Sequence, residues 1–198
     1  MQPEPIQKLA SQLSKLPDIG PRAANRLVFY LINRDQEELE QLSVLIKNLK
    51  KRIHLCPQCF NIAESDQFCP ICQDSRRDKE IICIVENVLN IAPIEKTGQY
   101  HGLYHILGGL ISPADKIGPE KLKIKELIER IKNSKNGIKE IIFALSPTTE
   151  GDTTAFYIER LLSPLKIKTS RLARGLSIGS DLEYIDENTL SSALRGRK

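Results

Sequence analysis

The chain has 198 residues, of which 29 are lysine or arginine and 25 are aspartate or glutamate, so its formal net charge is +4. This length allows one medium domain or two to three small ones, and the mild basic bias permits nucleic-acid binding without demanding it. The lack of tryptophan and the few aromatic residues argue against an RNA-binding domain built on base stacking. No apolar stretch reaches the length of a membrane span and residues 1–20 lack a signal-peptide core, so we expect a soluble, cytoplasmic protein.

Apolar residues recur at helical spacing over residues 6–16, 21–32 and 39–49, which predicts three helices at the N-terminus. The first two are joined by a turn, residues 17–20, that is short enough to force them to pack against each other. This segment resembles a helix-hairpin-helix, which presents backbone amides and a helix N-terminus to a DNA phosphate without reading sequence. The alternative is an ordinary helical hairpin whose arginines are merely solvated.

Two groups of basic residues are candidate DNA contacts. Arg22 and Arg26 lie one helical turn apart and would flank a phosphate at the hairpin. A second surface is formed by the basic run at the end of the third predicted helix, with Lys47, Lys50 and Lys51. Such a run is also common on a helix face that only contacts solvent.

Two CxxC pairs, separated by nine residues, predict a structural zinc site. Each pair forms a tight turn that aims two thiolates at one metal, and a proline stiffens both turns at the matching position. The alternative is a pair of disulfides, which needs an oxidising compartment that nothing in the sequence supplies. Because four sulfur ligands leave no open coordination position, we expect the zinc to stabilise the fold without taking part in catalysis. The predicted ligands are Cys56, Cys59, Cys69 and Cys72.

Beyond the cysteines, short apolar runs alternate with helical patterns. Strands are predicted at residues 81–85, 103–107, 141–145 and 167–172, with helical patterns over residues 124–131 and 155–162. This alternation predicts a mostly parallel sheet with covering helices, an α/β arrangement that follows an all-α N-terminal part. Cys83 lies within the first run and is expected to be a buried core thiol. Functional groups should gather at the carboxyl ends of the strands, where Glu86 and the loop of residues 146–152 lie.

The chain as a whole resembles the bacterial RecR family of recombination mediators. The motifs that carry the resemblance, in order, are LPDIGPRAANR, CPQC with CPIC, IICIVE, YHILGGLISPADKIGP, SPTTEGDTTAFYIERLL and TSRLARGLSIGSDLEYIDENTLSSALRGR. The resemblance implies a helix-hairpin-helix domain at residues 1–53, a four-cysteine zinc finger at 54–79, a Toprim domain at 80–174 and a C-terminal oligomerisation segment at 175–198. Departures from the family pattern are Asp18 and Ser180, each at a position where glycine is usual.

The resemblance also implies a function and partners. It implies a non-enzymatic DNA-repair protein that works with RecO and RecF to help RecA displace single-strand-binding protein, assembled as a ring-like homotetramer that encircles DNA. The chain contains no GxxxxGK[ST] loop, so we expect no nucleotide hydrolysis.

The Toprim pattern bears on whether the chain is an enzyme. That pattern needs a glutamate after the first strand, which Glu86 supplies, and two aspartates that hold Mg²⁺. The turn that should supply the aspartates reads Ser-Pro-Thr at residues 146–148. We therefore expect Glu86, Glu150 and Asp152 to form an acidic rim that binds a basic partner such as RecO. The alternatives are a metal-dependent, nuclease-like phosphoryl-transfer enzyme and a protein-interaction module without DNA affinity.

Overall fold

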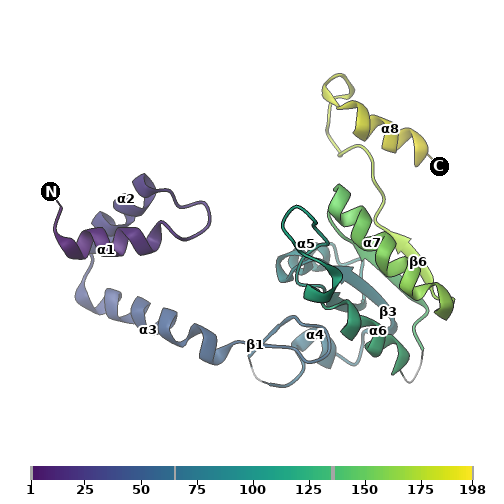
Figure 1. Ribbon diagram of the computed structural model, residues 1–198, viewed down its shortest axis with the longest axis horizontal. Coiled ribbons are helices and arrows are strands. Elements are labelled where there is room, and N and C mark those ends of the chain that lie inside the picture. Colours follow the sequence, from purple (N-terminus) through teal and green to yellow (C-terminus); the bar gives the residue numbers. More distant parts are fainter. Residues whose placement is uncertain (1, 65, 135–136, 198) are drawn as a thin grey trace. The chain divides into compact units, whose positions relative to one another are not determined.

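The computed structural model describes residues 2–64, 66–134 and 137–197. The chain divides into two compact units, one that ends at Arg52 and one that begins at Ile53. Figure 1 labels the elements along the chain, and each unit is described by itself. Among the described helices, none is long and apolar enough to cross a membrane.

The first unit contains the three predicted helices: α1 (Glu4–Leu13), α2 (Pro21–Ile32) and α3 (Gln36–Arg52). The predicted hairpin is confirmed, because Ala10 of α1 and Ala24 and Val28 of α2 are buried together. The first helix was expected to continue through residue 16, but it ends at Leu13. The reason is local: residues 15 and 16 make bonds to carbonyls three positions back, which tighten the last turn before Pro17.

The second unit is built on a four-stranded sheet with the order β4-β3-β5-β6. All three strand pairs are parallel, as the alternation of strands and helices predicted. The strands are β3 (Asp78–Val85), β4 (Gly102–Ile106), β5 (Glu140–Ala144) and β6 (Lys168–Arg171). Because β4 is an edge strand, its outer side must be protected by other parts of the chain.

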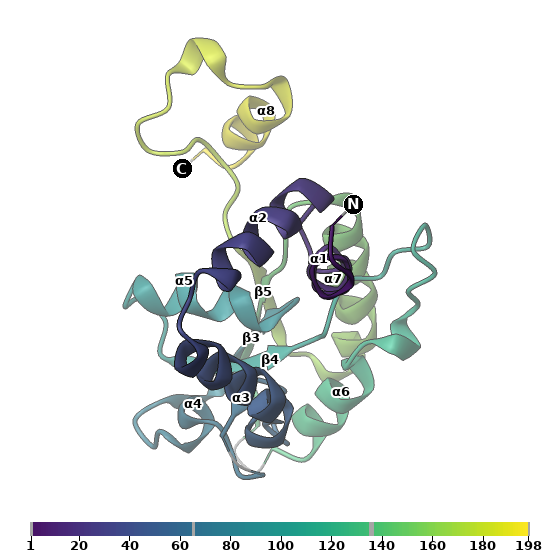
Figure 2. The same ribbon diagram turned by 90° about the vertical axis from the view of Figure 1, so that its left-hand side faces the viewer.

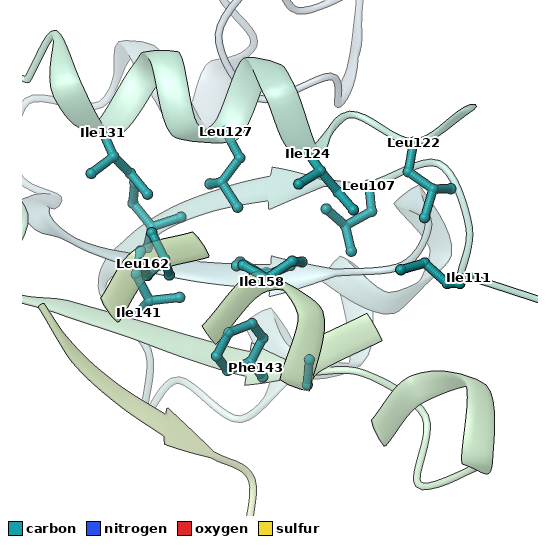
Figure 3. Close-up of a cluster of buried hydrophobic side chains, with 13 residues drawn as sticks. Leu107, Ile111, Leu122, Ile124, Leu127, Ile131, Ile141, Phe143, Ile158 and Leu162 are labelled. Carbon is teal, nitrogen blue, oxygen red and sulfur yellow. The ribbon is translucent and has the colours of Figure 1, made fainter. Parts of the chain in front are cut away.

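Helices α6 (Ile124–Lys132) and α7 (Thr149–Leu162) cover one face of this sheet. Alternate strand residues point to this face, and they pack against apolar side chains that recur every three to four residues along each helix. Figure 3 shows this core, with Leu127 and Ile131 of α6 directed at the strands and Ile158 of α7 beside Phe143.

Helix α5 (Ile91–Lys96) lies on the opposite side of the strands from α6 and α7 (Figure 2). It follows a 3-10 turn (Val88–Asn90) that Asn87 caps by accepting a bond from the amide of Leu89. The sequence patterns did not predict α5, because its six residues are too few for a helical periodicity. Further 3-10 turns lie at Pro119–Lys121 and Ser163–Leu165.

The cysteine-rich segment contains β1 (His54–Leu55), β2 (Ile62–Ala63) and α4 (Pro70–Gln73). The two strands pair in antiparallel fashion, and α4 begins at a proline, where a missing amide costs nothing. All four cysteines belong to one buried cluster with sheet residues of β3, β4 and β5. The finger therefore shares its core with the sheet.

The C-terminal segment contains a 3-10 turn (Leu182–Tyr184) and helix α8 (Glu187–Arg195). Asp181 and Asp186 cap the two helical starts with their side chains. The segment exposes large apolar side chains, with Ile178 and Tyr184 almost fully in solvent.

Candidate zinc centre and nucleic-acid surface

The four predicted zinc ligands come together at one point. Their sulfur atoms all lie within 4.8 Å of one another, and Cys59 Sγ lies 3.5 Å from Cys69 Sγ. A tetrahedral zinc with Zn–S bonds of about 2.3 Å places its ligands about 3.8 Å apart, so the cluster fits this metal. The first turn is closed by the amide of Phe60, which donates to the carbonyl of Cys56 at 3.0 Å. The second turn is closed in the same way by Gln73 and Cys69 at 3.0 Å.

The cysteines perturb one another's acidity. Hydrogen bonds from Cys59 and then Cys72 lower the pKa of Cys69 to about 2. Hydrogen bonding to Cys69 and Cys72, together with burial, raises the pKa of Cys59. A bound dication stabilises all four sulfurs as thiolates. This cluster agrees with the predicted structural zinc site.

Cys83 is separate from the metal ligands, as predicted. It is buried in β3, and burial raises the pKa of its thiol to about 12. A thiol with so high a pKa is not a nucleophile at neutral pH.

The hairpin between α1 and α2 adopts a conformation that explains the glycine usual at position 18. Asp18 has a φ of 62°, in the left-handed region that glycine enters most readily and that aspartate tolerates. Gly20 then precedes Pro21 at the start of α2, where the first amides of a helix have no carbonyl partner within the helix. Arg22 and Arg26 are exposed on α2 next to this turn.

The second predicted basic surface lies on α3. Lys47, Lys50 and Lys51 are exposed and recur at helical spacing, so they form one stripe. An apolar stripe on the same helix is also exposed, and it includes Leu45, Ile46 and Leu49.

Glu86 stands at the carboxyl end of β3, where the sheet topology places it. Its Oε1 accepts bonds from Ser146 Oγ at 3.1 Å and from Asn87 Nδ2 at 3.4 Å. Its Oε2 is buried and has no hydrogen-bond partner among the described residues. Glu86 and Glu150 line a hollow of about 300 Å³ that also contains Asp115, a third carboxylate that sequence reasoning missed. Asp115 comes from the loop after β4, and only the fold brings it here.

The predicted acidic rim is assembled in part. The loop expected over residues 146–152 is shorter, because α7 begins at Thr149 with Thr148 as its cap. Glu150 and Asp152 therefore occupy one helical turn, where residues two apart face different directions. Glu150 faces the hollow with Glu86, whereas Asp152 pairs with Arg171 at 2.9 Å and with Arg174 at 3.0 Å. These arginines lower the pKa of Asp152, with Arg174 as the main cause.

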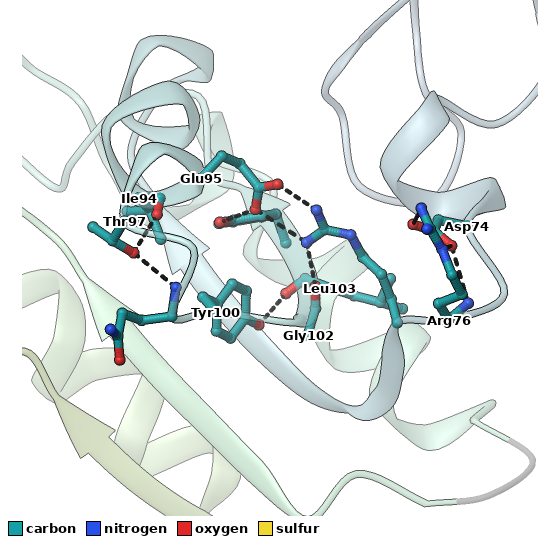
Figure 4. A network of polar contacts seen from close by, with 11 residues as sticks. Asp74, Arg76, Ile94, Glu95, Thr97, Tyr100, Gly102 and Leu103 are labelled. Atoms are coloured by element: carbon teal, nitrogen blue, oxygen red, sulfur yellow. Dashed lines mark hydrogen bonds and ion pairs between the residues drawn. The ribbon is translucent and has the colours of Figure 1, made fainter.

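A polar network that the sequence did not reveal joins the finger to the sheet (Figure 4). Arg77 pairs with Glu95 of α5 and donates to the carbonyl of Gly102 at 3.0 Å. Tyr104 donates its hydroxyl to Glu95 at 2.6 Å. Arg77 holds the pKa of Glu95 below its ordinary value, so the carboxylate stays charged in this partly buried position. No local pattern connects residues 77, 95 and 104, because they meet only after β4 pairs with β3.

His105 of β4 is fully buried beneath the finger. Its ring packs edge-on against the Phe60 ring, with 5.4 Å between the two ring centroids. Its Nε2 lies 2.8 Å from the carbonyl oxygen of Lys123. Since a carbonyl only accepts, Nε2 carries the proton. Burial lowers the pKa of His105 to about 4, with Arg130, Glu126 and Lys123 as the charged groups that face it.

We expect the stability of the protein to fall as the pH drops from about 6.5 towards about 4. The folded protein keeps His105 neutral in this interval whereas the unfolded chain protonates, so acid favours unfolding by up to roughly 3 kcal/mol. Denaturant titrations at saturating zinc would measure how the free energy of unfolding changes with pH. A His105→Gln variant cannot titrate and should give a flatter profile over the same pH interval. A variant profile parallel to that of the natural chain would contradict the assignment.

Comparison with protein families divides the chain into four matched segments. Residues 6–50 match the family described as RecR, helix-hairpin-helix, and residues 53–74 match the four-cysteine zinc finger domain of RecR. Residues 80–173 match the Toprim domain, and residues 175–198 match RecR, C-terminal.

Curated proteins similar to this chain share nearly its whole length. Recombination protein RecR of Staphylococcus aureus strain MRSA252 is 47% identical over 195 residues, which cover 98% of this chain and 97% of the relative. Proteins of the same name from Acidothermus cellulolyticus and Rubrobacter xylanophilus are 46% and 45% identical over 193 residues, covering 98% of this chain and 96% of each relative.

Proposed function

Since this chain belongs to the RecR family of recombination proteins, we propose that it acts in recombinational DNA repair as a non-enzymatic, DNA-binding mediator. In this role an oligomer of the chain encircles DNA and works with RecO and RecF to promote loading of RecA. The observation that carries the proposal is the joint presence of a basic, hairpin-bearing first unit and a zinc-stabilised Toprim sheet in one chain.

The proposed DNA surface consists of Arg22, Arg26 and the α3 stripe of Lys47, Lys50 and Lys51. Their exposure supports this assignment, because phosphate contacts need accessible cations. Such contacts carry no sequence information, so binding should be independent of sequence.

A homo-oligomer, with a tetramer as the proposed state, accounts for two features. A chain with a net charge of +4 has little attraction for DNA by itself, whereas several copies around one opening add their fields. The apolar stripe of α3 and the exposed side chains of the C-terminal segment, Ile178 and Tyr184 among them, offer faces for contact between copies.

The proposed docking site for a basic partner such as RecO is the acidic hollow of Glu86 and Glu150. The free Oε2 of Glu86 supports this, because a buried carboxylate oxygen without a donor among the described residues gains from an incoming cation. Asp152 was included in the predicted site, but it already pairs with two arginines, so it is less available to a basic partner.

Glu86→Ala should therefore weaken partner docking at least tenfold while leaving DNA affinity nearly unchanged, since loss of one buried charge contact costs about 2 kcal/mol or more. Calorimetric titration with purified RecO would measure the first effect. Glu129→Ala, an exposed carboxylate on α6, serves as the control. Equal losses of partner and DNA binding in the Glu86 variant would count against a docking role.

The second candidate function is a metal-dependent phosphoryl-transfer enzyme, which the Toprim match favours. The hydroxyls at residues 146–148, where the pattern needs aspartates, argue against it. Incubation of supercoiled plasmid with Mg²⁺ distinguishes the two. If the natural chain nicks the plasmid and the Glu86→Ala variant does not, the protein is an enzyme and the mediator proposal is wrong.

The proposal as a whole is tested by DNA binding of the purified protein over a salt series, alone and with RecO. We expect sequence-independent binding whose log affinity falls linearly with log salt, together with an oligomer by sedimentation. A monomer at tens of micromolar, roughly the range in which weak oligomers still assemble, would contradict the clamp. If the protein does not bind DNA either alone or with RecO, the alternative of a protein-interaction module would be favoured.

A further inference from the structure

The zinc cluster carries a charge that the finger alone does not balance. Four thiolates around one Zn²⁺ have a net charge of −2. Cys56, Cys59 and Cys69 are completely buried, so water does not solvate this charge. A buried charge is tolerated when a fixed counter-charge or hydrogen-bond donors lie beside it.

Arg130, in the last turn of α6, is the cation placed to supply this balance. Its Nη1 donates to the carbonyl of Tyr104 at 2.6 Å, which fixes the guanidinium at the outer edge of β4. Its Nη2 is buried and has no hydrogen-bond partner within the part of the chain that the structure describes. Arg130 and Gln58, which lies inside the first CxxC turn, line the same cavity of about 430 Å³. Burial lowers the pKa of Arg130, and the nearby Cys72, Cys59 and Cys56 oppose that shift.

The first zinc turn also bonds to this edge of β4. Several backbone groups of this strand have partners outside the sheet. The carbonyl of Gly102 accepts from Arg77, that of Tyr104 accepts from Arg130, and the amide of Ile106 donates to the carbonyl of Cys59 at 2.9 Å. The first zinc turn therefore continues the hydrogen bonding of the sheet, and opening of the turn frees the amide of Ile106 at the sheet edge.

We propose that Arg130 is the fixed counter-charge of the zinc-thiolate cluster, and that it couples metal occupancy to closure of the β4 edge. The finger and the Toprim sheet then form one cooperative unit. Zinc affinity depends on a residue of α6, far beyond the last cysteine ligand in the sequence, and the integrity of β4 depends on the metal.

Three single variants separate charge from hydrogen bonding and from bulk stability. Arg130→Gln removes the charge and keeps a donor for Tyr104, whereas Arg130→Lys keeps the charge. Lys132→Gln removes an exposed charge from the same helix and is the matched control. Zinc affinity is measured by competition with a chromogenic chelator at a temperature well below thermal unfolding.

We expect Arg130→Gln to bind zinc about 10- to 100-fold more weakly, as is usual when a partner of the metal ligands is lost. Arg130→Lys should retain most of the affinity and Lys132→Gln all of it. A merely structural role would lower the melting temperature and leave zinc retention unchanged, and that result would overturn the proposal. If Arg130→Gln does not fold, the Arg130→Lys variant decides. A tenfold loss of zinc affinity in that variant, which retains the charge, would also overturn the proposal.

Backbone hydrogen exchange in the natural chain tests the coupling to β4. As chelator removes zinc, exchange at the amide of Ile106 should rise in step with metal loss. The amide of Ile142 in the interior strand β5 should remain protected longer. Protection of Ile106 that persists after the metal is gone would show that the edge closes without it.

Discussion

Replacing Cys69 with serine should release the zinc and destabilise the second unit by several kcal/mol. The binding free energy of a structural zinc is folding free energy, and a serine hydroxyl is a far poorer ligand than a thiolate. The effect should exceed that of losing a small autonomous finger, because the four cysteines share one buried cluster with β3, β4 and β5. Zinc content by atomic emission and unfolding in denaturant would be measured on the same preparation.

Cys83→Ala is the matched control for this experiment. It removes a cysteine of the same buried cluster that is not a ligand, so the variant should keep its zinc and lose only about 1 kcal/mol or slightly more from the small cavity. The zinc assignment would fail if the Cys69→Ser protein unfolded like the control. It would fail as well if the natural chain, purified without added metal, were fully folded with less than about half an equivalent of zinc.

Reversing the α3 stripe, by glutamate at Lys47, Lys50 and Lys51, should weaken DNA binding about a thousandfold at roughly 50 mM salt. Each lost phosphate contact removes about 0.9 from the slope of log affinity against log salt, so the slope should flatten by almost three units. The loss should be equal for all sequences, because phosphate contacts do not distinguish bases. Fluorescence anisotropy over a salt series with two unrelated sequences would measure both effects.

A variant with the same change in net charge elsewhere controls for nonspecific repulsion. Glutamate at Lys125, Lys132 and Lys166 alters three exposed lysines of the second unit and should leave the slope nearly unchanged. Sedimentation must accompany the measurement, since the apolar stripe of α3 lies on the same helix as the lysines. An unchanged slope in an intact oligomer of the stripe variant would exclude α3 as the DNA surface.

Local spacing in the sequence was enough to predict the zinc ligands and the main elements. A CxxC pair is a short turn, so the direction of its two sulfurs depends on residues 56–59 or 69–72 alone. In the same way, the apolar runs of the strands and the periodic faces of α6 and α7 are properties of consecutive residues. The parallel sheet followed from their alternation, because parallel neighbours need a crossover between them.

Contacts between distant segments were decided only by the tertiary structure. Asp152 was predicted beside Glu86, yet the helical turn that begins at Thr149 directs it to Arg171 and Arg174. Arg130 reaches the edge of β4, and the cavity that it shares with Gln58 of the first zinc turn, only because α6 packs on the sheet with one particular register. Periodicity shows which face of an element is buried, but it does not contain the register between elements, and that register determines which charges meet.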